Sequence, residues 1–248
     1  MAKTSPTVSV VIPAYNEATY INRLLTALEK QRSVDFEVIV SDAESKDGTK
    51  EAVDSFKGKL ELKFIEAPPR GPAYGRNQGA KHARGGWLLF LDADVVIKDE
   101  EFIHKLLDET AKKGWNTSSA QLKVLKGSVL GKIGHSQPYL NLMSHTKHPI
   151  MQGYCMFTNR QVFEANHGFN EQIQYGEDND YATRVAPEGF GFVKNLYYYV
   201  DPRRYQQEGW KLLFKNTKHE LYRLTHGFSF EKNKASYEFG KHKPREPN

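Results

Sequence analysis

The sequence of 248 residues is poor in features that would place it outside the cell or in a membrane. It has a single cysteine, Cys155, which excludes a framework of internal disulfides and suits a reducing cytosol. No apolar run approaches the roughly 18–20 residues of a membrane-spanning helix. Residues 1–7 are short and polar and lack the apolar stretch of a signal peptide. We therefore expect a cytoplasmic protein.

Several common site motifs are also missing. No G-x-G-x-x-G follows the first expected strand and no G-x-x-x-x-G-K-[ST] loop occurs, which disfavours a dinucleotide-binding oxidoreductase and a P-loop enzyme. The spacing of four histidines matches no compact zinc motif, so we expect them to be solvated or locally hydrogen-bonded: His135, His145, His148 and His167.

The charge is unevenly distributed. The 35 Lys and Arg exceed the 30 Asp and Glu by five, but residues 203–248 alone carry 11 basic against 5 acidic side chains. The other 202 residues, with 24 against 25, are nearly neutral. The basic tail fits an anionic membrane, an anionic ligand or nucleic acid. A nucleic-acid-binding module would interleave that charge with exposed aromatics, and we do not expect nucleic acid as a partner.

The first half alternates short apolar runs with helical patterns. Four runs predict buried strands, at residues 8–12, 36–40, 60–65 and 87–91. Between and after them, helices are expected from a cap at Asn16 through an apolar stripe to Leu28, and over residues 49–56, 76–83 and 99–112. This alternation predicts an α/β fold with a doubly wound, mostly parallel sheet flanked by helices.

The second half is less regular. Residues 115–150 show no single period, while strands are expected at 151–157 and 197–200 and a helix at 177–185. From Trp210 to Leu224 an apolar helical face runs beside a face of lysines. That helix either packs its apolar face on the domain or lies on an anionic membrane surface.

Two acids follow the strand at residues 87–91, one residue apart. Ligands of doubly wound sheets bind beyond the carboxyl ends of the strands, so polar residues after the strands should converge there. Asp92 and Asp94 can point into the same crevice, where their repulsion calls for a positive charge. A hard divalent cation that prefers oxygen ligands is the obvious candidate.

Five short motifs occur in order over roughly residues 8–210. They are Pro13-Ala14-Tyr15-Asn16-Glu17, the acidic segment 42–49, Arg76-Asn77-x-Gly79 before Asp92-Ala93-Asp94, Gly168-Phe169-Asn170 followed by Glu177-Asp178, and Arg203-Arg204-Tyr205. Together they resemble family-2 glycosyltransferases with the GT-A fold. The resemblance implies an inverting, metal-dependent transfer of a sugar from a nucleoside-diphosphate donor to an acceptor hydroxyl.

The resemblance also implies roles for single residues. Asp178 would be the general base, with Glu177 beside it in the catalytic pair. Asp94 would bind Mn²⁺ or Mg²⁺ directly, and Asp92 would contact the metal or the donor ribose. The donor-binding positions would be Pro13, Tyr15, Glu17, Asp42, Arg70, Gly71, Arg76, Asp92 and Ala93. Tyr15 would stack on the nucleobase and Asp42 would accept a hydrogen bond from it, although Asp42 could instead close a local turn.

Departures from the family pattern narrow the expected activity. Ala43-Glu44 stands where Asp-Gly is usual, and residues 206–210 lack the Arg of the Gln-x-x-Arg-Trp signature of processive synthases. We therefore expect transfer of single sugars rather than chain polymerisation. The expected donor is a UDP- or GDP-sugar. The acceptor would be a glycan, a lipid-linked sugar or another hydroxyl.

The resemblance divides the chain into a transferase domain and a tail. Residues 1–210 would form the domain, with a nucleotide-sugar half at 8–114 and an acceptor half with the base at 115–210. Residues 211–248 would form a basic amphipathic helical tail, which allows peripheral contact with the inner face of a membrane. An alternative is a nucleotidyltransferase that makes sugar nucleotides, but its usual Gly-rich loop with a basic residue is absent after the first strand.

Overall fold

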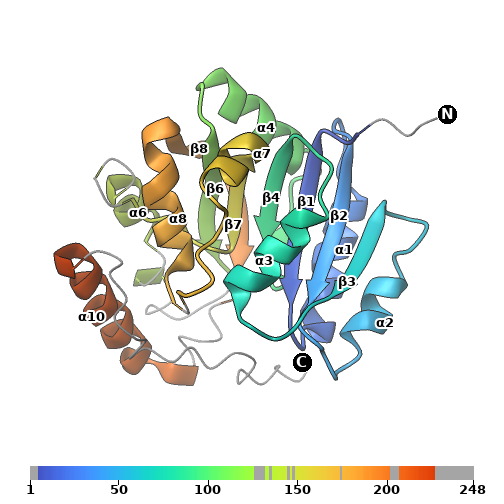
Figure 1. Cartoon of the computed structure of the whole chain (residues 1–248), viewed down its shortest axis with the longest axis horizontal. Coiled ribbons are helices and arrows are strands. Elements are labelled where there is room, and N and C mark those ends of the chain that lie inside the picture. Colours follow the sequence, from blue (N-terminus) through green and yellow to red (C-terminus); the bar gives the residue numbers. More distant parts are fainter. Residues whose placement is uncertain are drawn as a thin grey trace.

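The fold was obtained as a computed structural model, which describes residues 5–125, 132–133, 136–143, 146, 149–173, 175–201 and 207–226. Eight strands form one sheet in the order β3-β2-β1-β4-β7-β6-β8-β5 (Figure 1). The strands are β1 (Val8–Ala14), β2 (Phe36–Asp42), β3 (Leu62–Glu66), β4 (Trp87–Leu91), β5 (Val96–Ile97), β6 (Thr117–Val124), β7 (Cys155–Asn159) and β8 (Phe190–Val200). The sheet is continuous across both expected halves, so their division stays a prediction.

The sheet is mixed, with a parallel part that carries the N-terminal half. β1 to β4 pair in parallel, as do β6 and β8. β7 runs antiparallel to both β4 and β6, and β5 runs antiparallel to β8. The carboxyl ends of the first four strands therefore lie at one edge, and the segments after them meet there.

Helices cover both faces of the sheet (Figure 1). They are α1 (Ala18–Glu29), α2 (Thr49–Asp54), α3 (Pro72–Lys81), α4 (Phe102–Lys112), α6 (Gln137–Met143), α7 (Arg160–Ala165), α8 (Glu177–Val185) and α10 (Trp210–His226), with a 3₁₀ turn at η1 (Ala186–Glu188). Side chains of α1 and α4 pack in one buried cluster with the sheet, and those of α3, α7 and α8 in another. Within the described residues, no helix is both long and apolar enough to span a membrane.

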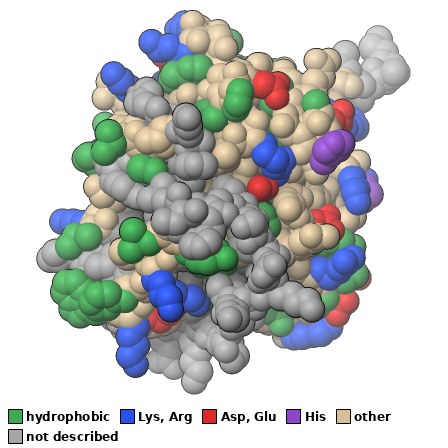
Figure 2. Space-filling view, turned by 60° about the vertical axis from the view of Figure 1, so that its left-hand side comes forward, with side chains coloured by type: hydrophobic (Ala, Val, Ile, Leu, Met, Phe, Trp, Pro, Cys, Tyr) green, Lys and Arg blue, Asp and Glu red, His purple; other side chains and the backbone are tan. Residues whose placement is uncertain are grey.

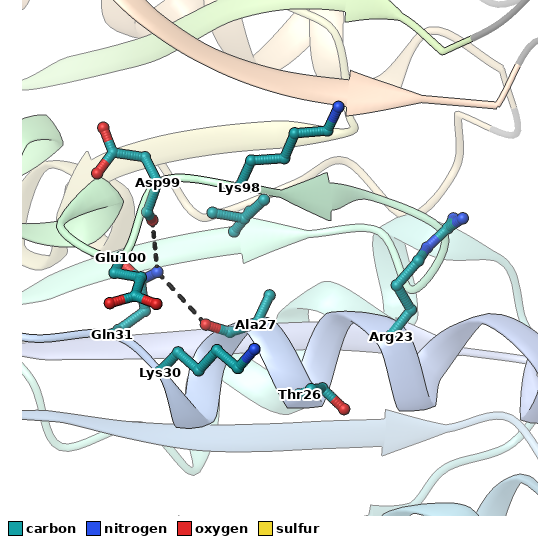
Figure 3. Close-up of a pocket in the computed structure, with 9 residues that line it drawn as sticks. Arg23, Thr26, Ala27, Lys30, Gln31, Lys98, Asp99 and Glu100 are labelled. Atoms are coloured by element: carbon teal, nitrogen blue, oxygen red, sulfur yellow. Dashed lines mark hydrogen bonds between the residues drawn. The ribbon is translucent and has the colours of Figure 1, made fainter.

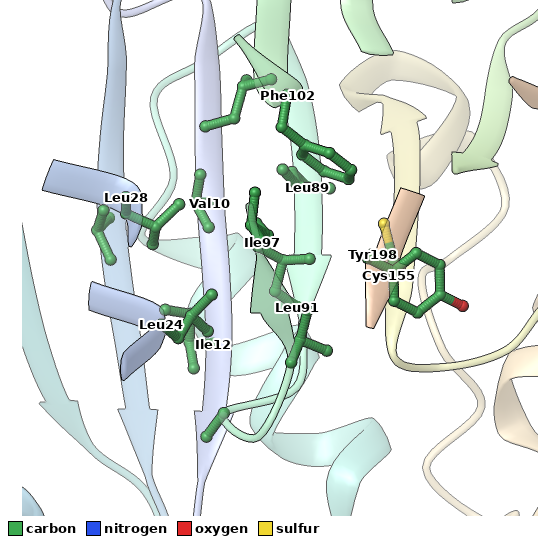
Figure 4. Packing of buried hydrophobic residues seen from close by; sticks show 14 of the residues in the cluster. Val10, Ile12, Leu24, Leu28, Leu89, Leu91, Ile97, Phe102, Cys155 and Tyr198 are labelled. Atoms are coloured by element: carbon green, nitrogen blue, oxygen red, sulfur yellow. The ribbon is translucent and has the colours of Figure 1, made fainter. Parts of the chain in front are cut away.

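The alternation of strand side chains builds the two cores. Val10 and Ile12 belong to the cluster on the α1 side, while Val11 between them belongs to the cluster on the α3 side. Figure 4 shows the α1-side cluster, where Leu24 of α1 meets the strand residues. Strands that are buried on both faces read as unbroken apolar runs, and this is why the sequence pattern identified them. Cys155 lies in this core, as expected.

Several helices and strands have bounds that differ from those expected from the sequence. Helix α3 begins at Pro72 rather than at residue 76, because Pro72 occupies its first turn and Gly71 precedes it. Strand β8 has 11 residues where only residues 197–200 were expected, and β7 begins four residues and ends two residues later than expected. Residues 115–150, which show no single period in the sequence, contain β6 and α6.

Polar residues hide β6 in the sequence. Thr117, Ser118 and Ser119 are fully buried. Their hydroxyl groups are paired: Thr117 with Thr158 at 2.9 Å, and Ser119 with the carbonyl oxygen of Cys155 at 2.7 Å. Because these hydrogen bonds satisfy the hydroxyls, the strand can be buried without an apolar run.

Candidate functional site

The expected polar residues meet at the carboxyl edge of the parallel strands. Ala14, the last residue of β1, pairs with Asp42 at the end of β2, and Asp42 pairs with Glu66 at the end of β3. Tyr15 follows β1 directly, and Asp92 follows β4 directly. The structure therefore brings these segments to one rim, which is where doubly wound sheets bind ligands.

Arg76 is the hub of the rim. It lies on α3 and is 2% exposed. One guanidinium nitrogen, Nη2, donates to Asp92 Oδ1 at 2.8 Å and to the carbonyl oxygen of Gly153 at 3.2 Å. The other, Nη1, donates to Glu177 Oε1 at 2.6 Å. A single side chain thus joins the Asp92 loop to the start of α8, 101 residues away from Arg76 along the chain.

The single positive charge of Arg76 faces several carboxyl groups. Burial alone would lower the pKa of Arg76. The combined effect of Asp92, Glu177 and Asp178 is larger and raises this pKa above its ordinary value. One guanidinium faces these three carboxyl groups, and Asp94 lies two residues from Asp92. The cluster therefore keeps an excess of negative charge, which favours binding of a cation.

Asp178 is held on both carboxylate oxygens by backbone donors. Its Oδ2 accepts from the Gly153 N–H at 2.7 Å and its Oδ1 from the Asn179 N–H at 2.8 Å. Burial and the neighbouring Glu177 raise the pKa of Asp178 to about 7, although Arg76 and the two N–H groups act in the opposite direction. A fixed carboxyl group that titrates near neutrality can take up a proton at neutral pH, as a general base must.

Gly153 is a site residue that the sequence analysis missed. A Cβ at this position would lie 2.7 Å from Arg76 Nη2 and 3.2 Å from Asp178 Oδ2. Only glycine leaves room for both contacts, and its own N–H and carbonyl oxygen bind the same two side chains. An isolated glycine inside an apolar run signals such a close approach, and that signal was present at residues 151–157.

Asn77 fastens α3 to the segment that precedes α8. Its Oδ1 accepts from the Phe169 N–H at 3.0 Å, and its Nδ2 donates to the Phe169 carbonyl oxygen and to Glu171 Oε1, both at 2.9 Å. The Arg76 guanidinium also lies over the Phe169 ring, 5.5 Å from its centroid. The Arg76-Asn77 and Gly168-Phe169-Asn170 motifs are therefore two sides of one contact.

The segment expected to hold the nucleobase is closed by local hydrogen bonds. Asp42 is 3% exposed, and its two oxygens accept from the Ser45 N–H at 2.8 Å and the Ser45 hydroxyl at 2.6 Å. This is the turn-closing role that was the alternative for Asp42. Contacts of Tyr15 and Asp42 with a base stay predictions.

Asn16 was expected to cap the first helix, and this prediction was wrong. Its φ is +55°, and Glu17 is the N-cap residue of α1. The Asn16 Oδ1 instead accepts from the Lys46 N–H at 2.9 Å, while the Glu17 N–H donates to Thr49 Oγ1 at 3.0 Å. Asn16 therefore ties the loop after β1 to the loop after β2.

Arg70 and Gly71 lie at the start of α3. The Arg70 guanidinium is exposed and lies 4.7 Å from the centroid of the Tyr74 ring. Gly71, the N-cap residue, has φ +103° and ψ 171°, a conformation that essentially only glycine adopts. The backbone at Gly71 thus has a structural reason to be glycine, and its close approach to a ligand stays a prediction.

The donor set for a metal consists of carboxylates. Asp92 and Asp94 are partly buried and flank the buried Ala93. Within the described ranges, no group of three or more His, Cys, Asp and Glu side chains gathers as a complete metal site. Two hard oxygen donors fit Mn²⁺ or Mg²⁺ when phosphate oxygens and water complete the shell.

The remaining expected site residues are partly placed. Pro13 is partly buried and ends β1 together with Ala14. The basic motif Arg203-Arg204-Tyr205 lies outside the described residues, as do His135, His145 and His148. His167 is described and its side chain is exposed, as expected.

A cavity of about 320 Å³ lies between α1 and the segment after β5 (Figure 3). Lys30, Lys98 and Asp99 contribute to its lining, and none of the expected site residues does. Arg23 at its edge donates to the Asp94 carbonyl oxygen at 3.1 Å. The cavity is therefore separate from the rim, and the Arg23 hydrogen bond links its edge to the Asp94 loop.

Comparison with known proteins gives a consistent family match. The profile of glycosyl transferase family 2 matches residues 9–166. The poly(ribitol-phosphate) beta-N-acetylglucosaminyltransferase TarS of Staphylococcus aureus is 41% identical over 96 residues, which cover 37% of this chain and 17% of TarS. Chondroitin synthase of Pasteurella multocida is 27% identical over 188 residues, or 74% of this chain and 19% of that protein. The chain spans about a fifth of the length of these curated relatives.

Two solved structures share the fold. TarS residues 1–349 in complex with UDP superpose with a TM-score of 0.66 and 24% identity, over 81% of this chain and 62% of that chain. The mannosyltransferase PcManGT from Pyrobaculum calidifontis, in complex with GDP-Man and Mn²⁺, gives a TM-score of 0.68 and 24% identity, over 79% and 57%. These likenesses confirm the expected GT-A-type arrangement.

Proposed function

Because this chain belongs to glycosyl transferase family 2, we propose that it transfers a single sugar from a nucleoside-diphosphate sugar to an acceptor hydroxyl. The observation that carries the proposal is the Arg76 cluster. It places Asp178, with a pKa raised to about 7, in the same network as Asp92 of the Asp92-Ala93-Asp94 motif. A base and a cation-binding loop in one network are what sugar transfer from a diphosphate requires.

The donor is a UDP- or GDP-sugar. TarS has been solved with UDP-GlcNAc and PcManGT with GDP-Man and Mn²⁺, and both share this fold. In this chain Tyr15 offers a ring face for the base and Asp42 an acceptor for a base N–H. The exposed Arg70 guanidinium near the N-terminus of α3 is free of carboxylate partners among the described residues, so it suits the diphosphate.

Asp94, with Asp92, holds Mn²⁺ or Mg²⁺, which when bound offsets the negative charge of the departing diphosphate. Arg76 keeps Asp92 in place for that task, since its Nη2 donates to Asp92 Oδ1. We assign Arg76 this positioning role because it is buried against three carboxyl groups. Its direct contact with the diphosphate, expected from the sequence, stays a prediction.

The proposed step is a single displacement. The acceptor oxygen attacks the anomeric carbon, the bond from that carbon to the phosphate oxygen breaks, and the nucleoside diphosphate leaves with the bonding electrons. Asp178 takes the proton of the acceptor hydroxyl. Attack opposite the leaving group inverts the anomeric configuration. Burial and the neighbouring Glu177 raise the pKa of Asp178, and Glu177 Oε1 itself accepts a hydrogen bond from Arg76 at 2.6 Å.

The donor half is tested by thermal-shift measurements with UDP, GDP, TDP and CMP, each with and without Mn²⁺. A ligand that binds the folded state raises the melting temperature. We expect UDP or GDP to do so only with Mn²⁺, and the Asp94→Asn variant to lose that shift. As a matched control, Asp35→Asn alters an exposed carboxylate away from the rim and should keep it. Equal shifts in the presence of EDTA would contradict the metal role.

A further inference from the structure

Helix α10 leaves three large apolar side chains exposed to solvent. Trp210 is 60% exposed, Phe214 71% and Leu221 60%. At 100° per residue these three positions share one face of the helix, and Leu212, which is 2% exposed, lies on the opposite face. The helix is therefore anchored through Leu212. Packing of the apolar stripe on the domain was one of the two expected arrangements, but these three exposed side chains do not pack in that way.

A basic stripe runs directly beside the apolar one. Lys211, Lys215 and Lys218 are exposed and lie about 100° around the helix from the apolar face. Within the part of the chain that the structure describes, none of them forms an ion pair with a carboxylate. Figure 2, with the side that carries α10 turned forward, shows hydrophobic side chains exposed next to Lys and Arg. Tyr222, 47% exposed, adds an amphipathic ring.

We propose that α10 docks in the plane of an anionic lipid bilayer. The apolar stripe (Trp210, Phe214 and Leu221) enters the boundary between headgroups and acyl chains, and the three lysines meet lipid phosphates. An apolar face flanked by lysines, with Trp and Tyr at its edge, is the arrangement of interfacial helices. Charge complementarity selects an anionic surface, because the three lysines are exposed and form no ion pair with a carboxylate among the described residues.

The docking helix is tied to the candidate base. The Tyr175 hydroxyl donates to Asn216 Oδ1 of α10 at 2.5 Å, and the Lys215 ammonium lies 5.8 Å from the centroid of the Tyr175 ring. Tyr175 lies three residues before Asp178. Docking of α10 would therefore bring the base segment to the bilayer surface. This step rests on the proposed function, and it assigns an acceptor hydroxyl that a membrane lipid carries.

Docking is tested by co-sedimentation of the full chain with vesicles at low salt. We expect binding to vesicles that contain phosphatidylglycerol and weak binding to pure phosphatidylcholine. Each lysine near an anionic surface is worth about 1 kcal/mol, so Lys211→Gln with Lys218→Gln should weaken binding about 30-fold. The matched pair Lys30→Gln and Lys113→Gln, which removes the same charge from the exposed C-cap positions of α1 and α4, should change it less than twofold.

A second variant tests the contribution of the apolar stripe to membrane binding. Phe214→Ser with Leu221→Ser should abolish sedimentation while the melting temperature stays within error, because both side chains are already exposed. Absence of sedimentation with the unaltered chain, or equal weakening by both lysine pairs, would overturn the proposal. Equal binding to both vesicle types would overturn the electrostatic part and point to a neutral lipid surface instead.

Failure of docking and failure of the proposed function give different results. Asp178→Asn should sediment as the unaltered chain does, because the change lies outside α10. Tyr175→Phe should also sediment normally, but it should lose any acceleration of transfer that vesicles bring to a lipid-borne acceptor. Acceleration that survives in Tyr175→Phe would overturn the link between α10 and the base, and leave the docking itself standing.

Discussion

Replacing Arg76 by methionine should destabilise the fold strongly. The change keeps an elongated side chain on α3 but removes the cation from a site where Glu177 is 6% exposed and lies 2.6 Å from the guanidinium. Breaking one partner of a buried ion pair costs about 3–5 kcal/mol, because the other charge stays buried and uncompensated. Asp92 retains 30% side-chain exposure and is partly solvated. We therefore expect a loss near the lower end, about 3 kcal/mol.

The loss is measurable by heat or urea. For chains of about 150–250 residues, 1 kcal/mol corresponds to roughly 2–4 °C in melting temperature, so Arg76→Met should melt about 6–12 °C lower. Adding Glu177→Gln removes the buried charge that has lost its partner, and it should recover most of the lost stability. The double variant thereby separates the charge effect from the change in side-chain shape.

An exposed ion pair serves as control. Lys105 and Asp99 lie 2.9 Å apart, but their side chains are 44% and 34% exposed, so Lys105→Met should have little effect on the melting temperature. If Arg76→Met were no more destabilising than Lys105→Met, Arg76 would not be the buried organiser of the rim. The same conclusion would follow if Glu177→Gln failed to restore stability in the Arg76→Met background.

Four further predictions concern the pH dependence of the transfer rate and of stability, and two glycines. Transfer should rise with pH through about 7 and then level off, since Asp178 must be ionised to act as base; a rate independent of pH between 5.5 and 8 would contradict this. The folded state retains the Asp178 proton up to about 7, so the free energy of unfolding should fall as pH rises from about 4 to 7, and Asp178→Asn should lessen that fall. Gly153→Ala forces a Cβ to within 2.7 Å of Arg76 Nη2 and should lower the transfer rate on the order of 100-fold, measured as initial rate; unchanged activity would sink this packing argument. Gly71→Ala should cost about 1–3 kcal/mol in urea denaturation, because φ is +103°, whereas Gly86→Ala, with open space around it, should be nearly neutral; equal effects would refute the backbone argument.

The N-terminal half of the sheet could be predicted because its strands are buried on both faces. Continuous apolar runs such as residues 87–91 can be recognised as buried strands in a single sequence. The acidic residues that follow them indicate the position of the rim. The tail helix was also predictable, since its apolar and basic positions repeat with helical period. What those faces contact could not be read from the pattern, and only the exposure of residues such as Phe214 decides it.

The partners of Arg76 could not be predicted. The sequence shows an arginine before a pair of acids, and this favours a phosphate ligand as readily as a carboxylate. Its partner Glu177 lies 101 residues further on, and its contact with the Gly153 carbonyl oxygen depends on a backbone approach. Similarly, β6 escaped detection because hydroxyl side chains fill its core positions and satisfy their hydrogen bonds inside the protein.

Asp178 is the proposed base of a sugar transfer from a bound nucleoside-diphosphate donor. The most direct measurement compares donor affinity and transfer rate in Asp178→Asn, with Asp35→Asn as the exposed-carboxylate control. We expect Asp178→Asn to bind the UDP- or GDP-sugar with nearly unchanged affinity and to show no detectable transfer, while the control keeps both. Full transfer activity in Asp178→Asn would show that Asp178 is not the base.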